Sequence, residues 1–288
     1  MSLATTRALV AAAQARGDGI GAFNVITLEH AEAVVAGASR AEVPVILQIS
    51  ENAIRFHLGQ VEPIVCACLA IARAASVEVA VHLDHIEEEG LLRKAAAAGV
   101  SSAMYDASKL DYAENVAATR RAADWAHDHD LYLEAELGEV GGKDGAHAPG
   151  VRTDPREAAE FVAATGVDAL AVAVGSSHAM TTRTASLDFE LISALRDAVA
   201  VPLVLHGSSG VPDDALRQAV ALGIVKVNIG TILNVAYTHA VRATLAGDAR
   251  LVDPRKYLAP ARDEIASVVQ RLAGLLSARG QTAAVTHR

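Results

Sequence analysis

Eight short apolar runs recur along the chain, each followed by a longer Ala-rich or amphipathic segment, and this alternation restricts the fold more than any other feature. The runs cover residues 19–25, 43–50, 77–85, 100–106, 131–138, 167–175, 201–207 and 224–230. Mostly apolar strands separated by helices are typical of a parallel sheet covered by helices on its outside. Eight such units in 288 residues predict an α/β fold, a closed (β/α)8 TIM barrel.

The main alternative is an open doubly wound sheet. That fold usually carries a G-x-G-x-x-G turn after its first strand, whereas the first run here continues as Asn24-Val25-Ile26-Thr27. No linker or low-complexity stretch divides the chain, so we expect one domain over residues 1–288. Residues 253–278 are predicted to form an extra C-terminal helix pair beyond the eighth unit, with DPRKYLAP (253–260) as the turn between the helices.

Charge and hydropathy restrict the partners. The net charge is −9, which argues against nucleic acid as a partner because nonspecific binding to a phosphate backbone needs a basic surface. No run of 18 or more apolar residues predicts a membrane span, and the chain does not open with a signal segment. We therefore expect no membrane partner and a cytoplasmic location.

The two cysteines, Cys66 and Cys68, are two residues apart in a predicted helix. Residues at that spacing point to different faces of a helix, so a disulfide between them is not expected. We predict two buried free thiols, which fits a reducing compartment.

Three histidines follow three of the apolar runs. His85, His178 and His206 come at or just past the ends of the runs that begin at residues 77, 167 and 201. If the runs are parallel strands of one barrel, all three imidazoles reach the same rim, where they would hold a catalytic zinc with one position open. A single histidine after a strand is more often a hydrogen-bonded rim residue, but three in the same arrangement favour a metal. His82, which lies deeper, is predicted to orient one of the ligands.

Carboxylates accompany these histidines. Asp84 either holds His85 in one tautomer or transfers protons at the metal, and we favour proton transfer. Asp106 and Glu136, at the ends of the fourth and fifth runs, are either outer hydrogen-bond acceptors or ligands of a second, weaker cation position.

Two Gly-rich stretches come after the seventh and eighth runs. Gly207-Ser208-Ser209-Gly210 and Asn228-Ile229-Gly230-Thr231 each precede a predicted helix. Loops at these places commonly bind phosphate through backbone N–H groups and a helix N-terminus. Ordinary turn formation is the alternative, but the location favours phosphate.

The longest non-periodic connection covers residues 138–155 and contains several glycines. A long Gly-rich loop on the rim of a barrel is typical of a lid or substrate loop. A disordered surface excursion is the alternative.

Several segments together resemble the class II, zinc-dependent fructose-bisphosphate and tagatose-bisphosphate aldolases. The resemblance covers nearly the whole chain, and the matching segments are AFNV (22–25), SENAIRFHLG (50–59), VHLDH (81–85), EAELGEVGG (134–142), GSSHA (175–179), VLHGSSG (204–210), KVNIGT (226–231) and DPRKYLAPARDEI (253–265). The resemblance implies a lyase of carbohydrate metabolism and glycolysis that forms a homodimer or homotetramer.

The resemblance also implies roles for residues of this chain. His85, His178 and His206 match the zinc ligands, and Asp84 matches the acid/base that handles the C4 hydroxyl. Asp106 and Glu136 match positions that bind zinc in a displaced state. A phosphorylated sugar is expected to bind at Asn24, Ser50, Ala179, Gly207, Ser208, Ser209, Asn228, Gly230 and Thr231. Zinc is the expected cofactor, and the family pattern also allows a monovalent cation.

The chain departs from the family pattern at three places, and these departures bear on the identity of the substrate more than on the reaction class. Gly141-Gly142 is followed by Lys143-Asp144, where the family has a loop glutamate that moves the proton at the enediolate carbon. Either Asp144 substitutes as a catalytic residue, Glu139 swings in, or the step differs. Ala179 replaces a glycine, and Gly230 and Ile232 replace the aspartates of the fructose-bisphosphate branch.

The sequence therefore predicts a zinc-dependent aldolase that cleaves a phosphorylated ketose to dihydroxyacetone phosphate and an aldehyde. The changed loop leaves two alternatives open. One is another metal-dependent sugar-phosphate lyase or epimerase on the same barrel, and the other is a catalytically decayed sugar-phosphate binder.

Overall fold

The structure is a computed structural model that describes residues 2–137, 152–176 and 180–277. Eight parallel strands close into a barrel in sequence order, each pairing with its neighbours and β1 with β8, which confirms the predicted architecture. The strands are β1 (Ile20–Asn24), β2 (Val45–Ser50), β3 (Val79–Ile86), β4 (Ser102–Tyr105), β5 (Tyr132–Glu136), β6 (Ala169–Val172), β7 (Leu203–Leu205) and β8 (Ile224–Ile229).

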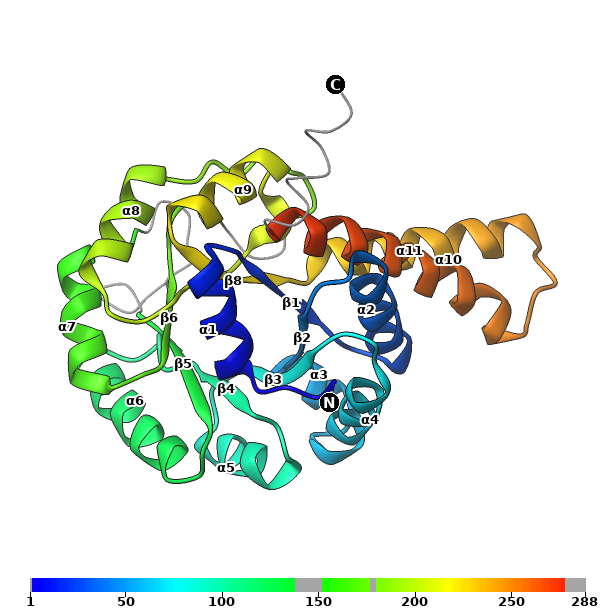
Figure 1. Cartoon of the computed structure of the whole chain (residues 1–288). Helices are drawn as coiled ribbons and strands as arrows, with labels where there is room; N and C mark the ends of the chain where they lie inside the picture. Colours follow the sequence, from blue (N-terminus) through cyan, green and yellow to red (C-terminus); the bar gives the residue numbers. More distant parts are fainter. Residues whose placement is uncertain (1, 138–151, 177–179, 278–288) are drawn as a thin grey trace.

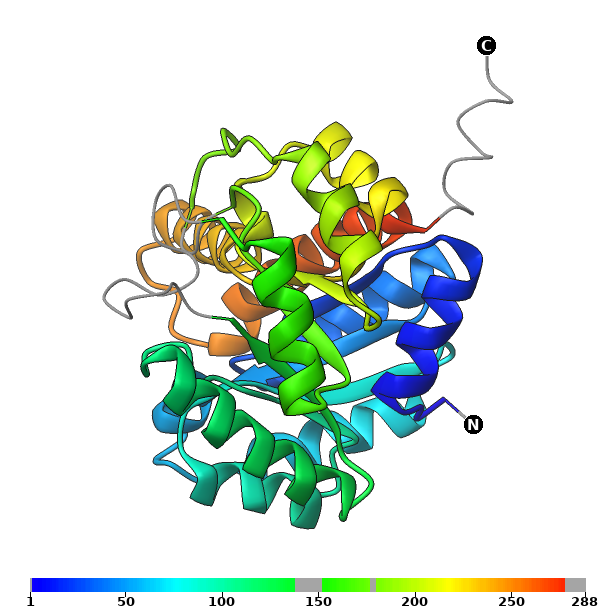
Figure 2. The ribbon, with the colours of Figure 1, turned by 90° about the vertical axis from the view of Figure 1, so that its left-hand side faces the viewer.

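Helices surround the barrel, as Figures 1 and 2 show from two directions. They are α1 (Thr6–Arg16), α2 (Leu28–Ala41), α3 (Glu51–Phe56), α4 (Glu62–Ala74), α5 (Glu89–Ala98), α6 (Tyr112–His127), α7 (Pro155–Thr165), α8 (Phe189–Ala198), α9 (Asp213–Leu222), α10 (Thr231–Gly247) and α11 (Pro254–Leu276). Helix α1 precedes the first strand and lies across one end of the barrel (Figure 1). A hydrogen bond from the backbone N–H of Thr6 to Ser101 Oγ, 3.0 Å long, holds it at the amino-terminal end of the strands.

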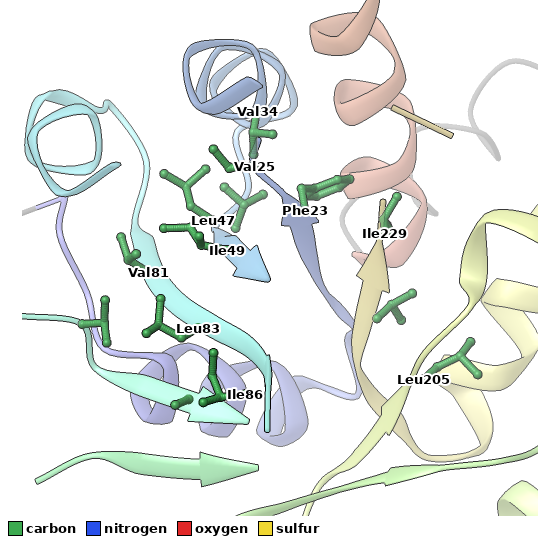
Figure 3. Packing of buried hydrophobic residues seen from close by; sticks show 14 of the residues in the cluster. Phe23, Val25, Val34, Leu47, Ile49, Val81, Leu83, Ile86, Leu205 and Ile229 are labelled. Atoms are coloured by element: carbon green, nitrogen blue, oxygen red, sulfur yellow. The ribbon is translucent and has the colours of Figure 1, made fainter. Parts of the chain in front are cut away.

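The core lies between strands and helices. Successive side chains of a strand point to opposite faces, so Leu47, Ile49, Val81 and Leu83 face outward into the apolar cluster between strands and helices, to which Val34 of α2 also belongs (Figure 3). The core is mainly aliphatic, as the 3% aromatic content implies. Because the apolar residues face outward, the polar residues that alternate with them point into the barrel.

The strand register brings the predicted site residues to one rim. Ser50 pairs with Asp84 between β2 and β3, and Ala22 pairs with Asn228 between β1 and β8. All strands run in the same direction, so their carboxyl ends meet at the same end of the barrel.

The C-terminal prediction was wrong in one respect. DPRKYLAP is not a turn between two helices but the start of one helix of 23 residues, α11. Asp253 caps it by accepting a hydrogen bond from the N–H of Arg255, and Pro254 occupies its first turn, where a missing N–H costs nothing. Pro260 lies inside the helix, which packs extensively against α2 and α10. The C-terminal end of α10 and the start of α11 project together away from the barrel (Figure 1).

The cysteine prediction was half right. Both thiols are free, and Cys68 is buried, but Cys66 is exposed. No helix in the described part of the chain is long and apolar enough to cross a membrane.

Candidate active site

A cavity of about 650 Å³ opens at the carboxyl ends of the strands. It is lined by residues that the sequence predicted as site residues: Asn24, Ser50, Asp84, His85, Asp106, Gly207, Ser208, Ser209, Asn228, Gly230 and Thr231. The strand ends thus bring together side chains that are up to about two hundred positions apart in the sequence, which is the usual way a barrel builds an active site.

A backbone irregularity places two of these side chains in the same space. In a regular strand, Asp84 and His85 would point to opposite faces. The register between β3 and β4 shifts between Leu83 and Ile86, and His85 has a left-handed φ of 48°. Such a conformation is strained for a residue with a side chain and is often found at functional sites. Both Asp84 and His85 consequently line the cavity, while Leu83 and Ile86 stay in the outer core.

Asp84, His85 and His206 offer ligand atoms that all lie within 4.8 Å of one another. The ring centroids of His85 and His206 are 4.8 Å apart, at an interplanar angle of 69°. Two imidazoles and a carboxylate are donors that suit zinc and similar divalent ions. The chemistry of this donor set therefore fits a catalytic metal.

A carboxylate orients each of the two imidazoles. Asp106 Oδ2 lies 2.8 Å from His85 Nδ1, and Glu134 Oε1 lies 3.0 Å from His206 Nε2. Glu136 Oε2 is 3.4 Å from the other nitrogen, His206 Nδ1. Carboxylates in such positions fix the tautomer and rotation of metal-binding histidines. In the described geometry, Asp106 and Glu136 both contact the imidazoles, and the choice between outer acceptors and a second cation position stays a prediction.

The surroundings of the two rings stabilise positive charge. Burial lowers the pKa of His85, but the carboxylates of Asp84, Asp106 and Glu136 outweigh it and raise that pKa to about 10. Burial likewise opposes protonation of His206, while its contacts with Glu134 and Glu136 raise its pKa. A site that favours a proton on its imidazoles also favours a cation between them.

On the other side of the cavity, backbone groups and a helix N-terminus form a site suited to an anion. Gly207 adopts a left-handed conformation and begins the 3₁₀ turn Ser208–Gly210. Helix α10 starts at Thr231, and Ser209 Oγ accepts a 3.2 Å hydrogen bond from the N–H of Ile232 in its first turn. Gly230 packs closely on Asn24, since an added Cβ would lie 3.1 Å from Asn24 Cγ. The N-terminus of a long helix carries partial positive charge and unpaired N–H groups that bind phosphate.

Comparison with known proteins identifies the family. Residues 4–281 match the family model of class II fructose-bisphosphate aldolases. The chain belongs to that family. The YdjI aldolase of Escherichia coli K12 is 33% identical over 97% of this chain and 99% of its own, with a TM-score of 0.84. A Coccidioides immitis protein provisionally assigned as fructose-1,6-bisphosphate aldolase is 26% identical over 96% of this chain and 98% of its own, with a TM-score of 0.82.

A third structure agrees in fold. Fructose-bisphosphate aldolase of Campylobacter jejuni is 22% identical over 96% of this chain and 95% of its own, with a TM-score of 0.82. The family resemblance read from the sequence motifs is thereby confirmed, and the reaction class is that of an aldolase lyase.

Three predicted residues of this aldolase lie outside the described residues: the metal ligand His178, the loop residue Asp144 and Ala179. Most of the predicted lid, residues 138–151, lies there as well. Their roles stay predictions.

The prediction that His82 orients one of the metal ligands was wrong. Its ring is fully buried inside the barrel, and its Nδ1 lies 2.8 Å from Ser102 Oγ rather than against a metal-binding histidine. Ser102 in turn bonds Thr6 of α1 at 2.5 Å. His82 therefore belongs to the contact between the barrel interior and α1.

Sequence reasoning missed Lys226 as a member of this aldolase's site. Its side chain is fully buried, and its Nζ donates to Glu134 Oε2 at 2.8 Å and to Asn228 Oδ1 at 2.7 Å. The signal was present, because a lysine in the middle of an apolar strand needs a partner. Glu134 lies at an inward position of β5, but its contact with Lys226 of β8 across the barrel is not visible in the sequence.

Further cavity residues were also missed. They lie mainly on β2 and α3 and include Gln48, Glu51, Asn52, Arg55 and Phe56. Gln48 Nε2 donates to Asn24 Oδ1 at 2.9 Å, and Ser50 caps α3 by accepting from the N–H of Ala53. Ser50 thus has a local structural role in addition to its place at the rim.

Proposed function

We propose that this class II aldolase depends on zinc and reversibly cleaves a phosphorylated ketose of the fructose- or tagatose-bisphosphate type into dihydroxyacetone phosphate and an aldehyde. The convergence of Asp84, His85 and His206 on one point of a cavity with an anion-binding side carries the proposal. We also propose a homo-oligomer, dimer or tetramer, which light scattering of the purified protein would test.

The metal would be held by His85 and His206, with His178 as the third ligand. Asp106 contacts Nδ1 of His85, so Nε2 of that ring would be available to the metal; Glu134 contacts Nε2 of His206, so Nδ1 would be available in that ring. When bound, zinc supplies a Lewis acid that polarises the ketone carbonyl and stabilises the negative charge left by cleavage.

The protein's own groups perform the remaining steps. The N-terminus of α10 and the turn after Gly207 bind the phosphate of the ketone half. The carboxylate of Asp84 accepts the proton of the C4 hydroxyl as the C3–C4 bond breaks, so that the aldehyde forms and the bonding electrons remain on the ketone half. Asn228 Nδ2 lies 3.3 Å from Asp84 Oδ1 and orients this carboxylate. Asp144 is the proposed donor that protonates the ketone half at C3.

The decisive experiment measures dihydroxyacetone phosphate release from fructose 1,6-bisphosphate, tagatose 1,6-bisphosphate and other phosphorylated ketoses, before and after chelation and after zinc is restored. We expect chelation to abolish cleavage and zinc to restore it. Asp84→Ala should retain zinc but lose at least about 100-fold in kcat, the usual contribution of a general base. Asp197→Ala, an exposed carboxylate on α8, should behave like the parent.

Other outcomes assign other roles. Unchanged cleavage without metal would refute zinc dependence. Loss of zinc from Asp84→Ala would make Asp84 a ligand rather than the base. A zinc-loaded protein that binds the sugar phosphates without releasing aldehyde from any of them would be a binder and not an aldolase.

A further inference from the structure

One cation lies fully buried beneath the site. Lys226 extends from β8 into the barrel, where its ammonium group contacts Glu134 on β5 and Asn228 two residues further along its own strand. Burying an ion pair costs desolvation energy that its attraction often fails to repay, and apolar replacements of such pairs are often equally stable. Stability alone is therefore a weak reason for this arrangement.

The contact with Asn228 determines which way its amide points. An ammonium group has three donors and no acceptor, so Asn228 presents its oxygen to Lys226. Its NH₂ group then points away from Lys226, toward Asp84, where Nδ2 donates to Asp84 Oδ1. Without the lysine, the two ends of the amide would differ little in packing and could exchange places.

The contact with Glu134 acts on the opposite side of the site. Lys226 Nζ donates to Glu134 Oε2, and the other oxygen of this carboxylate, Oε1, lies 3.0 Å from His206 Nε2. With both oxygens acting as acceptors, the carboxylate holds a ring proton of His206 on Nε2 and directs Nδ1 away from Glu134.

We propose that Lys226 is a positioning residue of the aldolase: its ammonium group turns the donor end of Asn228 toward Asp84 and the cavity and, through Glu134, sets the tautomer of His206. The proposal rests on the proposed function for the roles of Asp84 and His206. Lys226 is fully buried and is not among the residues that line the cavity, so we assign it no contact with reacting atoms. No covalent step is assigned to it.

Kinetics on two variants test the proposal. Lys226→Met should lower kcat/KM about 100-fold, the scale of losing one oriented donor in an active site. That variant leaves Glu134 buried without its cation, so poor folding alone could explain a loss. The double variant Glu134→Gln/Lys226→Met removes both charges with side chains of similar size. It should regain the urea midpoint of the parent while kcat/KM stays about 100-fold low.

The outcome that would overturn the proposal is recovery of parental kcat/KM in the folded double variant, because Lys226 would then only neutralise Glu134. Lys94→Met, a surface lysine on α5, serves as the control and should match the parent in both midpoint and kinetics.

A readout without turnover separates this proposal from the proposed function. The side-chain amide of Asn228 can be observed by ¹⁵N NMR and assigned by its disappearance in Asn228→Leu. We expect its resonances to shift in the double variant and to remain in place in Lys94→Met. Unchanged Asn228 resonances in the double variant would contradict the positioning role whether or not the protein cleaves any ketose tested. A shifted amide in a protein without cleavage would instead leave Lys226 as proposed and reject the aldolase substrate class.

Discussion

At the scale of single residues, Cys66 and Cys68 differ sharply although they are neighbours on α4. Burial raises the pKa of the Cys68 thiol to about 12, while Cys66 is exposed. Because the thiolate is the reactive form, we expect one thiol of the native protein to react rapidly with a disulfide reagent at pH 8, and two after denaturation. Cys66→Ser should remove the rapid phase, and rapid reaction of both native thiols would contradict the structure.

The same shift affects stability at alkaline pH. The folded-state pKa of Cys68 lies above its ordinary value of 9.0, so the unfolded chain loses this proton first. The contribution of the protonated thiol is complete below about pH 9 and is lost as pH rises toward 12. Cys68→Ala should therefore flatten the decline of the urea midpoint in this range, relative to Cys66→Ser.

Residue types and spacing predicted much of the site, but not how two of its members come to share one face. A strand pattern assigns Asp84 and His85 to opposite sides. The pairing of β3 with β4 carries a register shift and His85 has a positive φ, and no local sequence signal marks either feature. The partner of Lys226 could not be predicted from local sequence either, because Glu134 lies 92 positions away in the chain.

At the scale of elements, helices α2 and α11 meet at Gly37. An added Cβ there would collide with the backbone oxygen of Ala266 and lie 2.7 Å from Val269 Cβ. A backbone collision cannot be relieved by a rotamer change, so Gly37→Ala should destabilise the protein by about 1–3 kcal/mol, as overpacking usually does. Urea denaturation followed by circular dichroism measures this change.

Gly274, in α11, is the matched control. Nothing lies within 4 Å of a Cβ added there, so Gly274→Ala should stabilise the helix by about 0.5–1 kcal/mol through lower backbone entropy in the unfolded chain. Equal effects of the two substitutions would show that helix propensity, not the approach of α2 to α11, determines the cost.

The same helix shows why one element was mispredicted. Two prolines in DPRKYLAP resemble a turn when only local preference is considered. Asp253 and Pro254 are in fact the cap and first turn of α11, a helix start that the Asp-Pro pair itself signals. Pro260 is tolerated because α11 packs extensively against α2 and α10, and tertiary contacts of this kind override local propensity.

At the scale of the whole molecule, acid should unfold this protein through carboxylates held in ionised form by the fold. Glu134 is buried beside Lys226, and its pKa is lowered below the ordinary value of 4.5. Asp213 behaves similarly because Arg183 and Arg271 outweigh the effect of burial. A lowered folded-state pKa contributes stability above the ordinary value and loses it as pH falls. The buried Glu134 steepens the decline by up to about 1.4 kcal/mol per pH unit, since the unfolded chain takes up the proton first. Solvent screens the ion pairs of the more exposed Asp213, so its contribution is smaller.

We therefore expect the free energy of unfolding, obtained from urea titrations, to fall steeply between pH 5 and pH 3. Glu134→Gln/Lys226→Met removes the buried pair. It should reduce the slope of the free energy of unfolding against pH by up to about 1.4 kcal/mol per pH unit, the contribution of one proton. Asp253→Asn is the control: Asp253 also has a lowered pKa, owing to Arg255, but it lies at the surface at the start of α11, so solvent screens the interaction and the slope should barely change. A double variant with the parental slope would mean that Glu134 does not drive the acid transition. The barrel would then lose its stability in acid through charges on its surface and not through those inside it.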